Sequence, residues 1–443
     1  MGIQFTSSRV LFQPVQVKIT WRLDWRTVGS RRLASAAVFD ALKRKLYQTD
    51  TVVYSYGIPP NKPQDHNAHM SDSRYGLHRK VFHYDVNHRI RQMIMRTMSM
   101  FAGESEEIPF DPNKETIEKI LLVRATYRIG ESVLATPAIS LFRSKFPRAR
   151  IDFVGGATSK ILFQNLPIDH HYQLARRFPQ TCWAYPLLLK QLQSVGYDLA
   201  IDLSCSQSAM GAFIVRLSRA RFRIGRQGKW DHWFNVRLPK PGESNKYMML
   251  PAFLTPLGLG KIERFPSIAL SAAEKEAGKK KIAAAIGTSA NPVVGVFVGG
   301  RLYWGKRWAP ERFVKLVKNL SERGAKVVIF FGPEESELMS FYKQRVDPKI
   351  PMVAEFSLRN FAAMIASCQL FVTCDSGPMH LACAMGVRTV AIFIQPNANH
   401  WGPPPELGRI AYQKSGVSSS EVLDICVQEL RAVPGNANLL KTG

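Results

Sequence analysis

Residues 370–394 read LFVTCDSGPMHLACAMGVRTVAIFI and contain a strand, a helix and a second strand in close succession. Leu370–Thr373 is apolar and short, as buried strands are. Pro378–Met385 has the composition of a helix, with Pro at its first turn, where the missing N–H group is not needed. Gly386 ends this helix, and Thr389–Ile394 is the second strand. A strand–helix–strand unit of this kind predicts a parallel sheet covered by helices.

The same alternation runs through two longer stretches of the chain. Before residue 272 the expected strands are short apolar runs, which are typical of strands buried on both faces. They are Ile120–Val123, Ile151–Val154 and Leu199–Leu203, with helices expected up to Phe146 and over Ser159–Leu166, Pro186–Val195 and Ser208–Ser218. Beyond the Lys/Ala-rich helix expected over Ala272–Gly287, the strands Val293–Val298 and Lys326–Phe331 alternate with helices over Pro310–Arg323 and Ser357–Ser367.

We therefore predict an α/β chain of two doubly wound domains that face a cleft. The expected parts are a basic, His-rich N-terminal extension of uncertain order (1–115), a first domain (116–285), a second domain (286–405) and a C-terminal segment (406–443) that could pack back on the first domain. Because ligands of such sheets bind beyond the carboxyl ends of the strands, the loops at those ends are the candidates for function.

Composition limits the classes of protein that remain. The 443 residues include 60 Lys and Arg against 34 Asp and Glu, a net charge of +26, so the surface should attract phosphates on nucleic acid, anionic lipid or a nucleotide-linked substrate. Six scattered cysteines form no C-x-x-C pair, which argues against a disulfide scaffold or a zinc site. No apolar run approaches the roughly 18 residues of a membrane-spanning helix, and we expect a cytoplasmic protein.

The N-terminal extension carries basic amphipathic stretches. Asp40–Tyr47 and Arg89–Met100 could form helices that lie on a membrane surface or in a partner's groove, but an ordinary solvated helix or a loosely ordered extension is the interpretation we favour. The five histidines of this segment lack the spacing of a metal site, so we predict no metal there: they are His66, His69, His78, His83 and His88.

Three loops combine charge with glycine at the expected strand ends. The first, RATYRIGESVLAT (124–136), carries Glu131, which could act as a general base or simply stabilise a helix N-terminus. The second, VGGRLYWGKRWAPE (298–311), combines Gly299 and Gly300, which allow a ligand to approach the backbone closely, with cationic side chains for a diphosphate. Those cations are Arg301, Lys306 and Arg307, and the loop's Trp304 and Trp308 could either stack on a ligand or pack the loop down.

The third loop is the most specific feature. A strand ends at Asp375-Ser376-Gly377, and the free amides at the start of the following helix form a ready anion site, with His380 in its first turn. A capped helix without a ligand is the alternative, but two other cationic, glycine-bearing loops favour phosphate binding.

Together these loops resemble those of the ADP-heptose:lipopolysaccharide heptosyltransferases, glycosyltransferase family 9. The matching motifs are Gly130-Glu131 with Thr136-Pro137, Lys306-x-Trp308-x-x-Glu311, and Asp375-Ser376-Gly377-x-x-His380-Leu381-Ala382. The resemblance spans about residues 118–430 and implies two Rossmann-like domains of GT-B type, the first for the acceptor and the second for the nucleotide-sugar donor.

The resemblance also implies a reaction and roles for residues. It implies inverting transfer of a heptose or similar sugar, with ADP-heptose as the expected donor, to a lipopolysaccharide-core or other lipid-linked saccharide. Glu131 inherits the role of base, and no metal or other cofactor is needed. The implied donor-binding residues are Lys306, Arg307, Gly299, Gly300, Asp375, Ser376, Gly377, Met379 and His380.

The sequence departs from the family at three points. Glu131 replaces the usual Asp, Phe297-Val298-Gly299 replaces His-Pro-Gly, and Ser204–Ser208 replaces the usual Gln-Gly. These departures keep open a divergent, non-catalytic nucleotide-sugar-binding protein of the same fold. The expected partners are a nucleotide-sugar, a phosphorylated glycolipid or saccharide acceptor, and the anionic inner face of the cytoplasmic membrane. Nucleic acid is not expected, because no binding motif accompanies the charge.

Overall fold

The computed structural model describes residues 103–176, 180–206, 208–262, 265–287, 291–301 and 305–432. The amphipathic stretches Asp40–Tyr47 and Arg89–Met100, the five N-terminal histidines and Trp304 lie outside these ranges. The last part of the predicted N-terminal extension is described, and it packs on the first domain: the Ser105 N–H donates to His232 O at 2.8 Å and the Ile108 N–H to Asn235 O at 2.8 Å.

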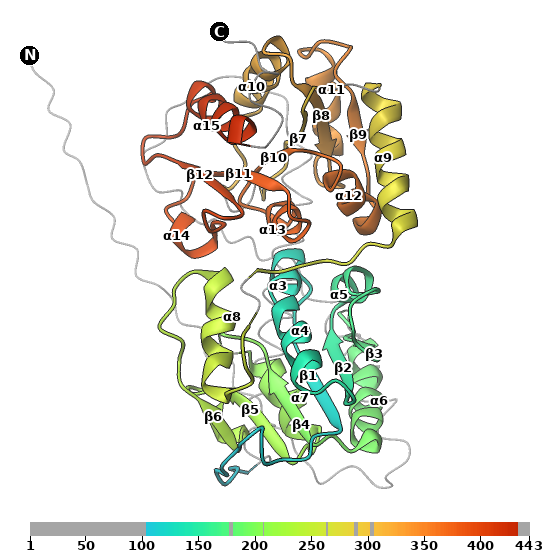
Figure 1. The fold of residues 1–443 in the computed structure, drawn as a ribbon, viewed down its shortest axis with the longest axis vertical. Helices are drawn as coiled ribbons and strands as arrows, with labels where there is room; N and C mark the ends of the chain where they lie inside the picture. Colours follow the sequence, from blue (N-terminus) through green and yellow to red (C-terminus); the bar gives the residue numbers. More distant parts are fainter. Residues whose placement is uncertain are drawn as a thin grey trace, which may run out of the picture. The chain divides into compact units, whose positions relative to one another are not determined.

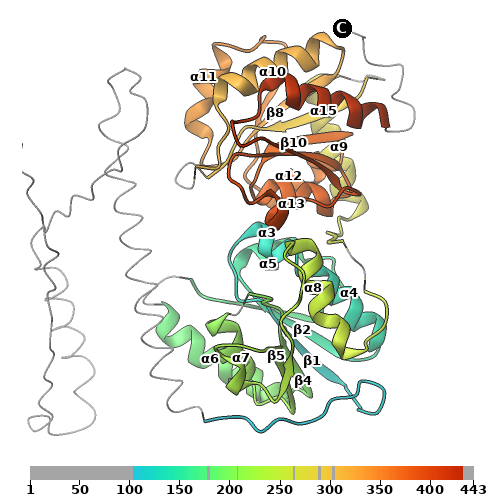
Figure 2. The ribbon, with the colours of Figure 1, turned by 90° about the vertical axis from the view of Figure 1, so that its left-hand side faces the viewer.

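The first domain is a six-stranded parallel sheet in the order β3-β2-β1-β4-β5-β6. Its strands are β1 (Lys119–Val123), β2 (Arg150–Gly155), β3 (His170–Gln173), β4 (Leu199–Asp202), β5 (Phe222–Arg226) and β6 (Val236–Leu238). Alternate residues of each strand point to opposite faces, so Leu122 packs in the layer of α4 and α8, while Leu121 packs in that of α6 and α7 (Figures 1 and 2). Burial on both faces explains why the strands are continuously apolar.

The helices of this domain begin and end where local signals allow. Ser208 caps α7 by accepting from the Gly211 N–H, and Asn245 caps α8 by accepting from the Tyr247 N–H. The helices are α3 (Ile129–Val133), α4 (Thr136–Lys145), α5 (Ala157–Leu162), α6 (Gln180–Val195), α7 (Ala209–Leu217) and α8 (Lys246–Leu254), with short 3₁₀ turns at Asp231–Trp233 and Thr255–Leu257.

The second domain repeats this architecture, with strand order β12-β11-β10-β7-β8-β9. The strands are β7 (Val293–Phe297), β8 (Lys326–Phe331), β9 (Met352–Ala354), β10 (Leu370–Cys374), β11 (Arg388–Phe393) and β12 (Gly408–Tyr412). Helices α10 and α15 cover one face, and α9, α12 and α13 cover the other (Figure 2). The helices are α9 (Ala272–Ile286), α10 (Pro310–Glu322), α11 (Met339–Lys343, preceded by a 3₁₀ turn at Ser336–Leu338), α12 (Leu358–Ile365), α13 (Gly377–Ala384), α14 (Ala398–Trp401) and α15 (Ser419–Ala432).

The predicted fold class is confirmed, and several details differ. Short strands such as β3 and β6 were not predicted, because their exposed or polar residues hide the apolar pattern. Helix α6 begins at Gln180 rather than at Pro186, which lies inside the helix. Residues 406–432 do not pack back on the first domain: β12 pairs with β11, and α15 packs with α10 in the core of the second domain.

The buried Arg359 side chain joins the two domains on one side. Arg359 of α12 is only 6% exposed and pairs with Glu274 of α9. Its guanidinium also donates to Leu162 O, at the end of α5 in the first domain, at 3.1 Å and to Ala269 O at 2.9 Å. The arginine thus donates to the last carbonyl of α5, a group that has no partner within its own helix.

Candidate active site

The strand order places the switch points of the two sheets at β1/β4 and β7/β10. From this point the strand order proceeds in opposite directions along the sheet, so the chain connections leave to opposite sides. This leaves a crevice at the carboxyl ends of the two strands. The loop after β1 carries Glu131, the loop after β7 carries Lys306, and the loop after β10 carries Asp375. The topology therefore brings together all three loops that the sequence singled out.

Glu131 lies in the short helix α3 and is held by three side chains of its own loop. Arg124 Nη2 donates to Glu131 Oε2 at 3.3 Å, Thr126 Oγ1 donates to the same oxygen at 2.7 Å, and Arg128 Nη1 donates to Oε1 at 3.1 Å. Burial by itself raises the pKa of Glu131, but the charge of Arg124, the Thr126 hydroxyl and the charge of Arg128 outweigh it and hold the pKa below its usual value. The carboxylate is therefore ionised at neutral pH and able to accept a proton.

The backbone next to Glu131 touches the second domain at Gly130. A Cβ atom on Gly130 would lie 2.3 Å from His380 Cδ2, so only glycine permits this contact. His380 is 3% exposed, and its Nδ1 lies 2.7 Å from the Tyr247 hydroxyl. Burial lowers the pKa of His380 to about 4, against the opposing charge of Asp375. The ring is therefore neutral at pH 7 and joins the domains, rather than adding the charge that an anion site at this helix would use.

Lys306 and Asp375 form the polar centre of the second domain's part of the site. Lys306 Nζ lies 2.5 Å from Asp375 Oδ2, and Asn397 Nδ2 donates to the same oxygen at 3.2 Å. Asp375 is 7% exposed, so its charge is compensated by these two donors rather than by water. Helix α13 begins two residues after Asp375, so its N-terminal amides follow directly on the residue that Lys306 contacts.

The other predicted donor-binding residues at the start of α13 differ in what they can offer a ligand. Ser376 is the N-cap, but its hydroxyl makes no cap bond and lies 3.2 Å from Thr373 Oγ1. A Cβ on Gly377 would meet the Ile129 side chain at 2.9 Å, so this helix start is pressed against α3. The Met379 side chain is fully buried, which leaves only its backbone for a ligand.

Gly299, Gly300 and Arg307 of the second loop make contacts that hold the loop in its conformation. A Cβ on Gly300 would lie 2.7 Å from Lys306 O, and one on Gly299 would lie 2.2 Å from the Phe297 ring. Arg307 Nε donates to Gly300 O at 3.2 Å, and its Nη2 donates to buried Glu335 at 3.3 Å. Arg307 therefore braces the loop that presents Lys306, and its predicted contact with a diphosphate stays a prediction.

Two other residues of this loop differ in exposure: Trp308 is buried and Arg301 is exposed. Trp308 is 2% exposed and donates from Nε1 to Val417 O at 3.1 Å, so it packs the loop down. Over the described residues no group of His, Cys, Asp and Glu side chains is arranged to hold a metal ion, and no helix there is both long and apolar enough to cross a membrane.

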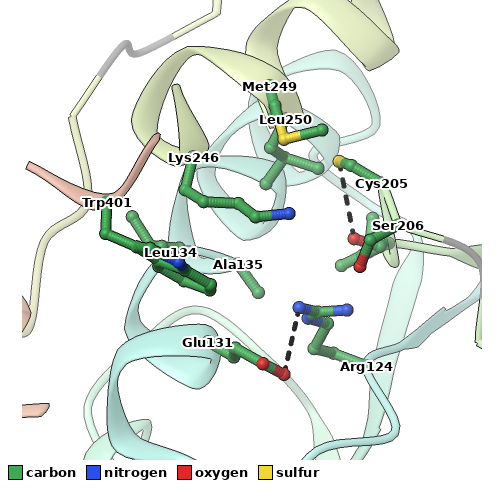
Figure 3. Close-up of a pocket in the computed structure, with 11 residues that line it drawn as sticks. Arg124, Glu131, Leu134, Ala135, Cys205, Ser206, Lys246, Met249, Leu250 and Trp401 are labelled. Atoms are coloured by element: carbon green, nitrogen blue, oxygen red, sulfur yellow. Dashed lines mark hydrogen bonds and ion pairs between the residues drawn. The ribbon is translucent and has the colours of Figure 1, made fainter. Parts of the chain in front are cut away.

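A hollow beside Glu131 contains residues that the sequence did not identify. Arg124, Lys246 and Trp401 line it, together with Ser206 and apolar side chains of α8, of the turn between α3 and α4, and of the loop after β4 (Figure 3). Lys246 Nζ lies 5.4 Å from the centre of the Trp401 ring, which comes from the second domain. Asn245, a residue type that often caps helices, could have indicated a helix that begins at Lys246, but we predicted no helix there.

Two Rossmann-type sheets whose switch points contribute to one site define the GT-B class of proteins. The sequence model of glycosyltransferase family 9 (heptosyltransferase) matches residues 187–421, more than half of the chain. Lipopolysaccharide heptosyltransferase 3 of Escherichia coli is 26% identical over 292 residues, which span 62% of this chain and 83% of that protein. Lipooligosaccharide heptosyltransferase 2 of Haemophilus ducreyi is 24% identical over 65% of this chain and 86% of its own.

Solved structures share the fold. A family 9 glycosyl transferase of Veillonella parvula superposes with a TM-score of 0.63 at 18% identity, over 73% of this chain and 99% of its own. An E. coli heptosyltransferase solved with ADP gives 0.57 at 16% identity, over 70% and 99% of the two chains. The chain belongs to glycosyltransferase family 9, the heptosyltransferase family, and is a glycosyltransferase.

Proposed function

We propose that this enzyme transfers a heptose from ADP-heptose to a saccharide of the lipopolysaccharide core, with inversion at the anomeric carbon. The observation that carries the proposal is the contact of Gly130 with His380, because it brings Glu131 of the first domain to α13, at whose start Lys306 and Asp375 lie. A base and a cationic anion site thus face one crevice. The similarity to an E. coli heptosyltransferase solved with ADP supports an ADP-linked donor.

In the proposed reaction Glu131 accepts the proton of the acceptor hydroxyl. The acceptor oxygen attacks C1 of the heptose while the bond from C1 to the diphosphate oxygen breaks, so the configuration at C1 inverts. The charge that develops on the departing ADP is met by Lys306 and by the N-terminal amides of α13, which are already oriented before the reaction. Asp375 holds Lys306 in place until the diphosphate engages it. Because these fixed groups oppose the charge, the proposed chemistry needs no metal, and EDTA is expected to leave the rate unchanged.

The test is transfer from ADP-heptose to deacylated lipopolysaccharide core, followed by ADP release and by NMR of the new anomeric linkage. Glu131→Gln is expected to lower turnover by about 10²–10⁴-fold while ADP affinity stays within about twofold. Glu131→Asp, which keeps the carboxylate, should retain part of the rate. Glu322→Gln removes an exposed carboxylate of α10 and serves as the matched control. Wild-type turnover in Glu131→Gln would exclude this residue as the base, and retention of configuration would exclude inversion.

We propose further that the enzyme binds its acceptor at an anionic membrane surface on the cytoplasmic side. The net charge of +26 supports this, because each basic residue near such a surface contributes about 1 kcal/mol. Sedimentation with phosphatidylglycerol vesicles at ionic strengths below and above about 0.1 M tests it. Binding should be lost at high salt and with phosphatidylcholine; equal binding to both lipids would contradict the proposal.

A further inference from the structure

Helix α6 of the first domain presents large apolar side chains to solvent. Trp183 and Leu187 are 59% and 56% exposed, and the exposed Pro186 lies between them. Residues four positions apart lie on the same face of a helix, so the two side chains adjoin. Over the described part of the chain five large apolar side chains are exposed, and α6 holds two of them. Single exposed apolar residues are ordinary, whereas two that adjoin on one helix indicate a contact surface.

The opposite face of α6 already supplies the packing that the first domain needs. Leu188 and Leu192 are buried in the layer that α6 and α7 form on the sheet. A helix on the surface of a domain is expected to be apolar on its core side and polar on its outer side. The apolar outer face of α6 is therefore not explained by the core of the domain.

The chain around α6 is strongly basic. Residues 171–230, which run from β3 through α6 and α7 to the loop after β5, contain nine Lys and Arg, two Asp and no Glu. Asp198 Oδ2 accepts hydrogen bonds from two backbone N–H groups at 2.9 and 2.8 Å, and Asp202 is only 4% exposed. The two carboxylates therefore do little to offset the positive charge at the surface of this region.

Exposed cations lie close to the apolar face. Lys190 is exposed and lies three positions after Leu187 on the same side of α6. Arg219 is exposed just after α7, and α7 lies beside α6 on the same face of the sheet (Figure 2). The Gln193 side chain joins the two helices by donating to Leu217 O at 2.8 Å. The surface thus combines apolar side chains with positive charge.

This surface begins at the same edge of the sheet as the Glu131 loop. A helix between two parallel strands runs back antiparallel to them, so α6 begins at the carboxyl edge, and Trp183 is its fourth residue. Tyr185 of α6 and Tyr127 of the Glu131 loop both donate their hydroxyl to Ala175 O, at 3.1 and 2.6 Å. Helix α6 is therefore tied directly to the loop that carries the proposed base.

The chemistry of this surface fits an anionic lipid bilayer. Trp is favoured at the boundary of a bilayer, Leu enters its apolar part, and Lys and Arg pair with anionic head groups. A second copy of the chain would bring the same positive charge to the contact, and like charges repel. A nucleic acid would attract the cations, but it offers no apolar phase to Leu187. A bilayer alone among these three occupants satisfies both the charge and the apolar side chains.

We propose that α6 docks the enzyme on an anionic bilayer, with Trp183 and Leu187 inserted among the lipids and with Lys190 and Arg219 at the head groups. The inference rests on the proposed binding at a membrane surface and adds to it the face of the protein that meets the lipid. Because α6 is tied to the Glu131 loop, docking through α6 holds that loop close to the surface from which a lipid-linked saccharide projects.

The test measures partition onto phosphatidylglycerol vesicles by sedimentation. Trp183→Ser combined with Leu187→Ser is expected to weaken binding about 10- to 100-fold, because about half of each side chain is available for insertion. Lys190→Gln should weaken it about fivefold. Ile161→Ser is the matched control, since it removes another exposed apolar side chain, from α5, and should change binding less than about twofold. Vesicles with brominated acyl chains should quench the tryptophan fluorescence of the wild type more than that of Trp183→Phe.

Further measurements separate docking from folding and from transfer. The double variant should keep its melting temperature within a few degrees and its kcat on soluble, deacylated lipopolysaccharide core within about twofold. If the double variant binds vesicles as the wild type does, α6 is refuted as the docking face, while binding at a membrane and transfer both stand. If the wild type binds no anionic vesicles even at low salt, both membrane proposals fail, and transfer to the soluble core is judged separately. Loss of a wild-type dimer, or of duplex DNA binding, in the double variant would overturn the assignment to lipid.

Discussion

Replacement of Gly130 by Ala would test the contact on which the site depends. Gly130 lies in α3 directly before Glu131, and its α carbon faces the His380 ring of the other domain. The added methyl group would stand 2.3 Å from His380 Cδ2 and 3.0 Å from His380 Nε2, both shorter than ordinary contacts of at least 3.4 Å. The two domains, or the loop of Glu131, must therefore move apart by about 1 Å.

This displacement sets the expected magnitude. His380 cannot move away freely, because it is buried and bonded to Tyr247 at 2.7 Å. Overpacking of this kind costs about 1–3 kcal/mol of folding free energy, which corresponds to a melting temperature lower by a few degrees. A misplacement of a catalytic group by about 1 Å lowers turnover about 10²-fold. We expect the fall in turnover to exceed the fall in stability, because Glu131 is the neighbouring residue.

The assay measures kcat from ADP release, ADP affinity by calorimetry and the melting temperature. Gly242→Ala is the matched control, since a Cβ on Gly242 meets no atom within 4 Å. In a double-mutant cycle, His380→Ala should relieve the clash, so the combined variant should lose less than the sum of the two single losses. Wild-type kcat in Gly130→Ala, or strictly additive losses in the cycle, would refute the reasoning that this contact positions the base.

Three further outcomes follow from the charges and hydrogen bonds of the site. Arg124→Gln removes the strongest opposing charge and should raise the pKa of Glu131, so the acid limb of the pH profile of kcat/KM should move to higher pH; an unmoved limb would contradict the assignment. Lys306→Ala should weaken ADP binding about 10- to 100-fold in calorimetry, and unchanged affinity would remove Lys306 from the diphosphate site. Tyr247→Phe leaves the buried His380 Nδ1 without its partner and should lower the free energy of unfolding by about 1–3 kcal/mol in urea titrations, whereas an unchanged value would show that the bond is not needed.

The fold was predictable because its signals are local. Runs such as Val327–Phe331 are apolar at every position, since a strand inside a parallel sheet is buried on both faces, and these residues belong to β8. The motif from Asp375 to Ala382 combines a strand end, a helix start and a proline that fits the first turn. Short edge strands such as β3 were missed, because side chains at the edge of a sheet need not be apolar.

The sequence by itself determined the alternation of strands and helices, the family to which the chain belongs and the three loops at the strand ends. Only the tertiary structure decided what each side chain in those loops contacts. Arg307 turns inward to Glu335, and His380 meets Tyr247, which is 133 positions away in the chain. Lys246 and Trp401 meet because two separately folded sheets dock at their switch points. Periodicity reports the burial of a residue within its own element, whereas such pairs depend on how the elements pack against one another.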